Sequence, residues 1–189
     1  MRIGILGAGT WGTALGRALA LNRHDVCIWS CFPEETEQLA ATRRHPHLPG
    51  AVIPESVSFT NEPAALSCRA DFILAVVPSV HMRKTIRQFV PFLEPDTILI
   101  SAAKGIESDT LMTLTEVIRD ELGKGGKQNR VCALSGPTHA EEVACDMPTL
   151  IVSASEDQDA ASAVQQLFEG TCIRPYVNQD ERVCRSVVH

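Results

Sequence analysis

Three glycines with the spacing G-x-G-x-x-G are the first residues whose types and positions could do chemistry: Gly7, Gly9 and Gly12. They follow an apolar run, Ile3 to Leu6, and precede apolar residues at helical spacing between positions 14 and 19. In such a strand-turn-helix the first glycine permits the tight turn, the second lets the backbone approach a pyrophosphate, and the third lets the helix pack closely. Unpaired N–H groups at the helix N-terminus favour the negative charge of a phosphate. The pattern predicts a dinucleotide site.

Lys104 is a second candidate because it is a lone cation directly after the apolar run Thr97 to Ser101, with a glycine beside it. A lysine in this position can hold an anionic substrate or polarise a carbonyl group. Ser135-Gly136-Pro137-Thr138 follows another apolar run. It offers a hydroxyl, a bare backbone and a helix N-terminus to a small polar or phosphorylated ligand. A solvated lysine and an ordinary helix cap are the alternative interpretations.

Four other side chains are weaker candidates. His81 and His139 fall just inside helices that are expected to follow strands. Either could be a general acid, since histidine exchanges protons near neutral pH, although a surface or packing role is the alternative. Cys31 and Cys132 have no identifiable base, so we interpret them as small hydrophobic residues that fill strands rather than as nucleophiles.

The residue that usually distinguishes NAD from NADP lies at the end of the second strand of such a fold. An Asp or Glu there accepts hydrogen bonds from the adenosine ribose, whereas an Arg accommodates the 2′-phosphate. The sequence Trp29-Ser30-Cys31-Phe32 offers neither. We interpret Glu34 and Glu35 as the start of the next helix. Arg43 and Arg44 either reach a phosphate or form a solvated basic turn.

These candidates need a scaffold in which strands and helices alternate. We expect strands at 3–6, 25–29, 57–59, 71–77, 97–101, 131–134, 150–153 and 173–177. We expect helices at 33–42, 63–68, 79–90, from Asp109 or Thr110 to Gly123, from Thr138 with Glu141 as a capping box, and at 157–168. This alternation predicts an α/β fold of the Rossmann type, a doubly wound, mostly parallel sheet with helices on both faces. Ligands bind such sheets outside the carboxyl ends of the strands.

Bulk properties exclude several classes of function. A formal net charge of −6 and the absence of a basic stripe argue against a nucleic-acid partner. Neither an apolar run long enough to cross a bilayer nor a charged-then-apolar leader is visible, so we expect a cytoplasmic protein without membrane insertion. Its seven cysteines are scattered and form no C-x-x-C pair, so we expect reduced thiols and no metal site.

With these pieces placed, the sequence resembles the N-terminal domain of bacterial NAD(P)-dependent glycerol-3-phosphate dehydrogenases. The resemblance runs from Arg2 to about Asp180. It is carried by the Thr-Trp pair of the glycine turn, Val26 to Trp29, His47-Leu48-Pro49-Gly50, Val76-Val77-Pro78-Ser79, Ala103-Lys104-Gly105-Ile106-Glu107, Leu134 to Thr138 with Ala140 and Glu141, and Tyr176-Val177-Asn178. It implies reversible hydride transfer between the nicotinamide and dihydroxyacetone phosphate, giving sn-glycerol 3-phosphate for phospholipid synthesis.

The resemblance also implies which residues contact each ligand. The triose phosphate would contact Lys104, Gly136 and Thr138. The family often has Arg or His at the position of Cys31, for the 2′-phosphate, so the coenzyme is NAD or NADP with the preference left open. Together with the glycine pattern, the expected coenzyme contacts are Gly7, Gly9, Thr10, Trp11, Gly12, Cys31, Lys104 and Ala140.

The end of the chain departs from the family, which continues into a glycine-rich helix bearing a proton-donor lysine and then into a helical substrate domain. Residues 181–189 contain no lysine and no glycine pair. We therefore expect a dinucleotide-binding domain over 1–180, an atypical tail over 181–189 produced by truncation or a shifted reading frame, and no helical domain. Such a chain would bind nucleotide but catalyse poorly.

The sequence leaves two other functions open. One is a nucleotide-binding module without turnover, and the other is a related two-domain dehydrogenase acting on a hydroxy acid or ketopantoate. A homodimer is a further expectation, since apolar surface exposed where the helical domain would dock favours self-association.

Overall fold

The structure, a computed structural model, describes residues 1–179, and the expectation for the tail 181–189 lies outside them. The strands are β1 (Arg2–Leu6), β2 (Asp25–Trp29), β3 (Ser58–Thr60), β4 (Phe72–Ala75), β5 (Ile98–Ser101), β6 (Val131–Ser135), β7 (Thr149–Ala154) and β8 (Ile173–Asn178). The helices are α1 (Thr10–Leu21), α2 (Pro33–Thr42), α3 (Pro63–Ser67), α4 (Ser79–Phe89), the 3-10 turn η1 (Val90–Phe92), α5 (Leu114–Lys124), α6 (Ala140–Ala144) and α7 (Gln158–Leu167).

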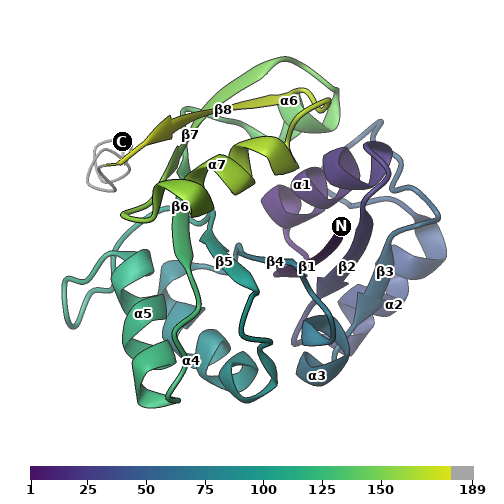
Figure 1. The fold of residues 1–189 in the computed structure, drawn as a ribbon. Coiled ribbons are helices and arrows are strands. Elements are labelled where there is room, and N and C mark those ends of the chain that lie inside the picture. The colour runs from purple at the N-terminus through teal and green to yellow at the C-terminus, as the bar shows by residue number, and fades with distance from the viewer. Residues whose placement is uncertain (180–189) are drawn as a thin grey trace.

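All eight strands form one sheet in the order β3-β2-β1-β4-β5-β6-β7-β8 (Figure 1). Neighbouring strands run parallel except β6 and β7, which pair antiparallel. The chain moves outward from β1 through β2 to β3, and then returns to the other side of β1 as β4. The predicted doubly wound, mostly parallel sheet is therefore confirmed. In such sheets, ligands bind outside the carboxyl ends of the strands at the point where the strand order reverses. Here that point lies at the ends of the neighbouring strands β1 and β4.

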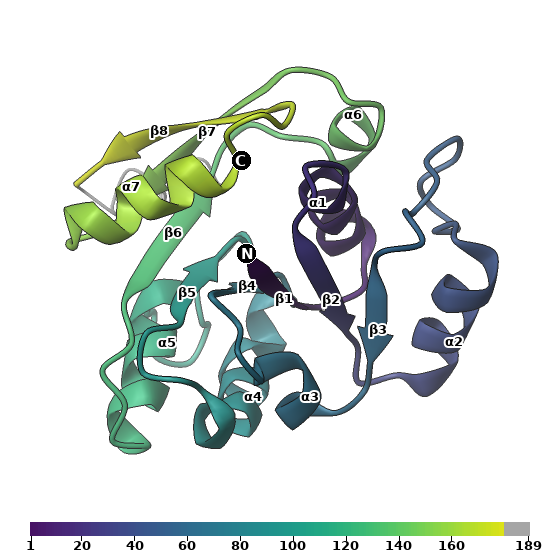
Figure 2. The same cartoon turned by 45° about the vertical axis from the view of Figure 1, so that its right-hand side comes forward.

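Two apolar cores cover the two faces of the sheet, because successive side chains of a strand point to opposite faces. From β1, Ile3 and Ile5 belong to the core that α1, α6 and α7 share. Leu6 and its neighbour Ala75 on β4 belong to the core under α3, α4 and α5. Figure 2 shows these two groups of helices on opposite sides of the strands. Both faces are thus buried, which leaves the carboxyl ends of the strands as the place for a site.

The predicted start of α5 is wrong. Residues 106–113 form a loop, closed by a β-bridge between Ile106 and Thr113, and α5 begins only at Leu114. Thr113 caps the helix in a capping box with Glu116, which provides a better start than Asp109 or Thr110. The predicted stop at Gly123 is also early, since the C-cap is Gly125. The delayed start matters because it creates a loop directly after Lys104.

The predicted capping box of Thr138 and Glu141 is also wrong. Helix α6 begins at Ala140 with His139 at the N-cap, and no side chain caps it. The Thr138 N–H donates to the Gly136 carbonyl oxygen at 2.9 Å, which makes a turn around Pro137. Because of this turn, the Thr138 side chain lies before the helix and is available to a ligand.

Candidate functional site

The glycine turn after β1 has the geometry that its sequence predicts. Gly7 has φ +119°, which only glycine adopts easily, and its N–H donates to the Trp29 carbonyl oxygen at 2.9 Å. A Cβ at position 12 would lie 2.1 Å from the Gly7 carbonyl oxygen, so Gly12 is required for close packing. A Cβ at Gly9 would meet nothing within 4 Å. Gly9 therefore leaves space that a ligand can fill, which is the role expected of a glycine beside a pyrophosphate.

A cleft of about 900 Å³ opens at the carboxyl ends of β1, β2, β4 and β5. This volume lies in the range of pockets that enclose cofactors. The turn after β1 lines the cleft, and so does the adjacent segment Val76-Val77-Pro78 after β4. The cleft thus lies where the strand order reverses. All the residues expected to contact the coenzyme line it: Gly7, Gly9, Thr10, Trp11, Gly12, Cys31, Lys104 and Ala140.

The residues expected to contact the substrate meet at one end of this cleft. Lys104 and Thr138 line the cleft itself, and both line a small adjoining pocket together with Gly136. These residues come from the segments after β5 and β6, which lie side by side in the sheet. The Trp11 indole N–H donates to the Ala102 carbonyl oxygen at 2.9 Å, which ties α1 to the end of β5. The structure therefore brings the two predicted ligand sets together at one place.

Lys104 is exposed, and its ammonium has no hydrogen bond or ion pair to another described residue. Its neighbour Gly105 has φ +109°, and a Cβ there would lie 3.3 Å from the Ser79 hydroxyl at the start of α4. The glycine thus lets the chain turn sharply beside α4. A cation with no partner in residues 1–179, at the rim of a cleft, is available to an anion.

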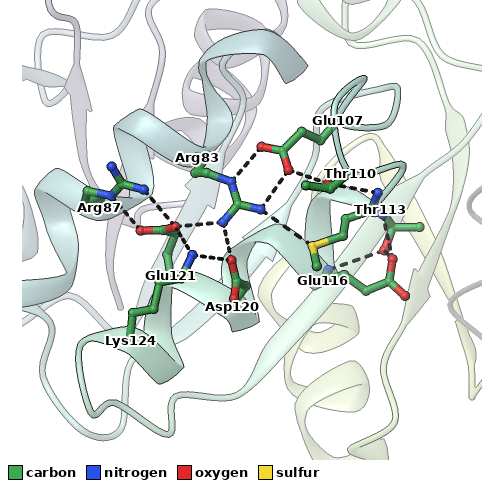
Figure 3. Close-up of polar contacts among 10 residues, drawn as sticks. Arg83, Arg87, Glu107, Thr110, Thr113, Glu116, Asp120, Glu121 and Lys124 are labelled. Atoms are coloured by element: carbon green, nitrogen blue, oxygen red, sulfur yellow. Dashed lines mark hydrogen bonds and ion pairs between the residues drawn. The ribbon is translucent and has the colours of Figure 1, made fainter.

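The loop that carries Lys104 is anchored by an ion-pair network (Figure 3). Arg83 of α4 donates from Nε and Nη2 to the two carboxylate oxygens of Glu107, both at 2.7 Å. Its Nη1 donates to Glu121 of α5 at 2.7 Å and also to Asp120. We call this group the Arg83 cluster; its members are Arg83, Arg87, Glu107, Asp120, Glu121 and Lys124. It connects the Lys104 loop to two helices.

The charges of the cluster stabilise one another. Hydrogen bonds from Arg83 and Thr110 lower the pKa of Glu107 to about 2. Hydrogen bonds from Arg87, and then from Arg83 and Lys124, lower the pKa of Glu121 to about 2 although burial opposes this. The same contacts raise the pKa of Arg83. Both carboxyl groups are therefore ionised at neutral pH, which keeps the anchor intact.

The weaker candidates have different outcomes. His81 and His139 both line the cleft and are exposed, with no carboxylate partner among the described residues. From the sequence we interpret Cys31 and Cys132 as small hydrophobic residues that fill strands. Cys132 is fully buried in β6, which agrees with this. Cys31 is exposed and lines the cleft, so the interpretation is wrong for Cys31. The reason is that β2 ends at Trp29, two residues before Cys31.

The basic turn after α2 does not reach the cleft. Arg43 donates to the Val57 carbonyl oxygen at 2.7 Å, pairs with Glu55 at 3.4 Å and lies over the Phe59 ring. Neither Arg43 nor Arg44 is among the residues that line the cleft. The interpretation of Arg43 as a phosphate contact is not supported by this geometry.

Sequence reasoning missed several cleft residues that α2 and α4 contribute. Glu35 belongs to α2, as predicted, yet its side chain also lines the cleft. Lys84, Thr85 and Gln88 of α4 line it as well, and their spacing along one helix face, starting shortly after the Pro78 turn, is the signal that could have found them.

Comparison with known proteins agrees with this geometry. The family model described as NAD-dependent glycerol-3-phosphate dehydrogenase N-terminus matches residues 2–161. The chain belongs to this family. Among curated relatives, glycerol-3-phosphate dehydrogenase NAD(P)+ 2 of Lactobacillus delbrueckii subsp. bulgaricus is 51% identical over 181 residues, which cover 95% of this chain and 54% of the relative. The enzyme named glycerol-3-phosphate dehydrogenase NAD(P)+ from Geobacter metallireducens is 42% identical over 180 residues, covering 95% and 53%.

A solved structure shares the fold. The crystal structure of glycerol-3-phosphate dehydrogenase from Coxiella burnetii superposes with a TM-score of 0.87 at 31% identity, covering 95% of this chain and 54% of that one. The chain thus spans about half the length of the relatives it matches. Residues 2–161 match the model of the family's N-terminus.

Three further observations bear on the function classes considered. Within residues 1–179, no helix has both the length and the apolar character that crossing a bilayer requires. The same residues contain no group of three His, Cys, Asp or Glu side chains placed to hold a metal ion. No disulfide bond joins any two of the six cysteines in residues 1–179.

Proposed function

We propose that residues 1–180 form the dinucleotide-binding domain of a glycerol-3-phosphate dehydrogenase. The whole protein would transfer a hydride reversibly between NAD(P)H and dihydroxyacetone phosphate, giving sn-glycerol 3-phosphate for phospholipid synthesis. The observation that carries this proposal is the meeting of Lys104, Gly136 and Thr138 at one end of a cleft whose middle is the glycine turn. Membership of the family supports it.

The residues of the cleft fit a nicotinamide coenzyme. The space beside Gly9 and the unpaired N–H groups at the start of α1 suit the diphosphate. Thr10, Trp11 and Ala140 line the same cleft, and the coenzyme, when bound, would supply the hydride. Gly7 and Gly12 serve this arrangement by shaping the turn. Cys31 lies at the other end of the cleft, near β2.

Lys104 would act on the substrate. Its ammonium, at the rim of the cleft, can bind the phosphorylated triose and stabilise negative charge that develops on the carbonyl oxygen. Gly136 and Thr138 offer a backbone and a hydroxyl on the neighbouring segment. These three residues have no evident use in a module that only binds nucleotide, which favours the dehydrogenase over that alternative. They also favour a triose phosphate over a hydroxy acid or ketopantoate.

The proposal is tested first by binding. Calorimetry on this chain should show one site for NADH, and dihydroxyacetone phosphate should bind more tightly when NADH is present. Lys104→Met should weaken the second step by about 10- to 150-fold, because loss of one charged hydrogen bond costs roughly 1.5–3 kcal/mol. It should weaken NADH binding less, because Lys104 is only one of several expected coenzyme contacts in the cleft. The reaction itself is measured on a polypeptide of the relatives' full length. Absence of NADH binding to the folded chain would overturn the proposal.

A cytoplasmic location and a homodimer belong to the same proposal. Both are checked on the whole protein, by cell fractionation and by sedimentation.

A further inference from the structure

The end of β2 presents a carboxylate to the cleft by an indirect route. Ser30 occupies the position where an acidic residue usually binds the adenosine ribose, and only 3% of it is exposed. Its hydroxyl donates a hydrogen bond to Oε2 of Glu35, in the first turn of α2, and accepts one from the Phe32 N–H at 3.1 Å. Glu35 and Phe32 both line the cleft. The carboxylate that is absent from the strand end is thus supplied by the following helix.

The backbone under this pair is itself held in place. The Asn61 side chain donates to the Ser30 carbonyl oxygen at 2.9 Å and accepts from the Thr36 hydroxyl at 3.0 Å. The Trp29 indole N–H donates to the Asn61 carbonyl oxygen at 2.9 Å. These bonds connect the end of β2 to the segment after β3 and to α2. The Glu35 carboxylate therefore projects from a fixed support, and little ordering is needed for it to bind a ligand.

We propose that Glu35 binds the adenosine ribose of the coenzyme and makes this chain prefer NAD(H) over NADP(H). The inference rests on the proposed function, since it assumes that a nicotinamide coenzyme occupies the cleft. A carboxylate accepts hydrogen bonds from the free 2′-hydroxyl of NAD(H). The 2′-phosphate of NADP(H) carries a charge of about −1.5 to −2 at neutral pH, and it would be repelled by the carboxylate.

Other charged groups near this end of the cleft do not neutralise the negative charge of the Glu35 carboxylate. His45 faces Glu35, but burial and the neighbouring His47 lower its pKa, which disfavours the charged form of its ring. Arg43 is directed to other partners. Lys84 lines the cleft from α4 and is exposed, without a partner among the described residues. Its ammonium is not fixed near the ribose position, whereas Glu35 is.

The experiment measures the dissociation constants of NADH and NADPH for the 189-residue chain by calorimetry at low ionic strength. Adenosine 5′-monophosphate and adenosine 2′,5′-bisphosphate serve as a second pair of probes that lack the nicotinamide. Variants are Glu35→Gln, Glu35→Asp and Ser30→Ala. Glu34→Gln is the matched control, because Glu34 is the adjacent exposed residue of the same helix and does not line the cleft. Thermal unfolding monitored by circular dichroism checks that each variant folds.

We expect the native chain to bind NADH at least about tenfold more tightly than NADPH, the effect of roughly 1.4 kcal/mol of repulsion and lost hydrogen bonding. Glu35→Gln should bring the two dissociation constants to within about threefold, mainly by improving NADPH binding. Glu34→Gln should leave their ratio unchanged. Glu35→Asp should keep the discrimination, and Ser30→Ala should reduce it without removing charge.

The outcomes separate the inference from the proposed function. If the folded chain binds neither coenzyme, the proposed function is wrong. If it binds NADPH as tightly as NADH, or if Glu34→Gln and Glu35→Gln change the ratio equally, the inference alone is wrong. Should Glu35→Gln fail to fold, the ratios for Glu35→Asp, Ser30→Ala and the two adenosine phosphates decide in the same way.

Discussion

Replacing Arg83 by methionine should destabilise the protein by removing the centre of the Arg83 cluster. The Glu121 side chain is 2% exposed, and Arg83 itself is 20% exposed. Breaking a fully buried ion pair costs about 3–5 kcal/mol, because a charge is left without its partner. Arg87 and Lys124 remain bound to Glu121 and reduce this cost. We therefore expect a loss of about 2–3 kcal/mol in the free energy of unfolding.

Arg87→Met is the control, since it removes a second arginine from the same carboxylate. The Arg87 side chain is 63% exposed, so its loss should cost much less than the loss of Arg83. Urea unfolding at pH 7 gives both free energies, and the melting temperature should fall by about 2–4 °C for each kcal/mol. Hydrogen exchange should speed up across residues 105–112 in Arg83→Met only. Equal losses for the two variants would show that burial does not set the strength of this cluster.

Three other predictions concern the cleft and the dependence on pH. Gly9→Ala should change the free energy of unfolding by no more than about 0.5 kcal/mol but weaken NADH binding at least tenfold. Gly12→Ala should destabilise the fold itself, because its Cβ would meet the Gly7 carbonyl oxygen. Equal melting temperatures for the two variants would contradict this. Lys104→Met should melt at the native temperature, because Lys104 has no partner among the described residues; a large drop would place it in a structural role. Glu107 and Glu121 have pKa values of about 2 in the folded chain, below the ordinary 4.5. The stability they contribute is therefore complete above about pH 4.5 and is lost as the pH falls toward 2. Urea unfolding should show the free energy of unfolding falling over this pH range, and falling less in Arg83→Met.

The strands could be predicted from the sequence because buried strands of a parallel sheet appear as short apolar runs between turn residues. The run from Phe72 to Ala75 and the run from Ile98 to Ser101 are of this kind. The start of α5 could not, because Asp109, Thr110 and Thr113 all have side chains that can cap a helix. The bridge from Ile106 to Thr113 decides among them, and no local pattern reveals this contact.

Some residues of the candidate site could also be predicted from the sequence, and others could not. Gly9, Lys104 and Thr138 could be found because each comes shortly after a strand, and parallel strands bring the residues at their carboxyl ends to one edge of the sheet. The roles of Glu35 and Arg83 could not be predicted, because both residues contact a different element of the structure. Glu35 of α2 contacts Ser30 at the end of β2, and Arg83 of α4 contacts the loop after β5. Contacts between elements depend on how the helices pack, and helix packing depends on the whole chain rather than on a local pattern.

The order of strands orients a coenzyme in the proposed site. Along the sheet, β2 carries the Glu35 end of the cleft, β1 and β4 flank the glycine turn, and β5 and β6 carry the Lys104 end. From β2 to β5 there are three strand spacings, about 14 Å at roughly 4.8 Å each. A diphosphate at the turn would therefore place a nucleoside at each end. The Lys104 end offers an anionic substrate a cation beside Gly136 and Thr138, so the nicotinamide belongs there and the adenosine belongs beside Glu35. The opposite charges at the two ends of one cleft would impose this direction.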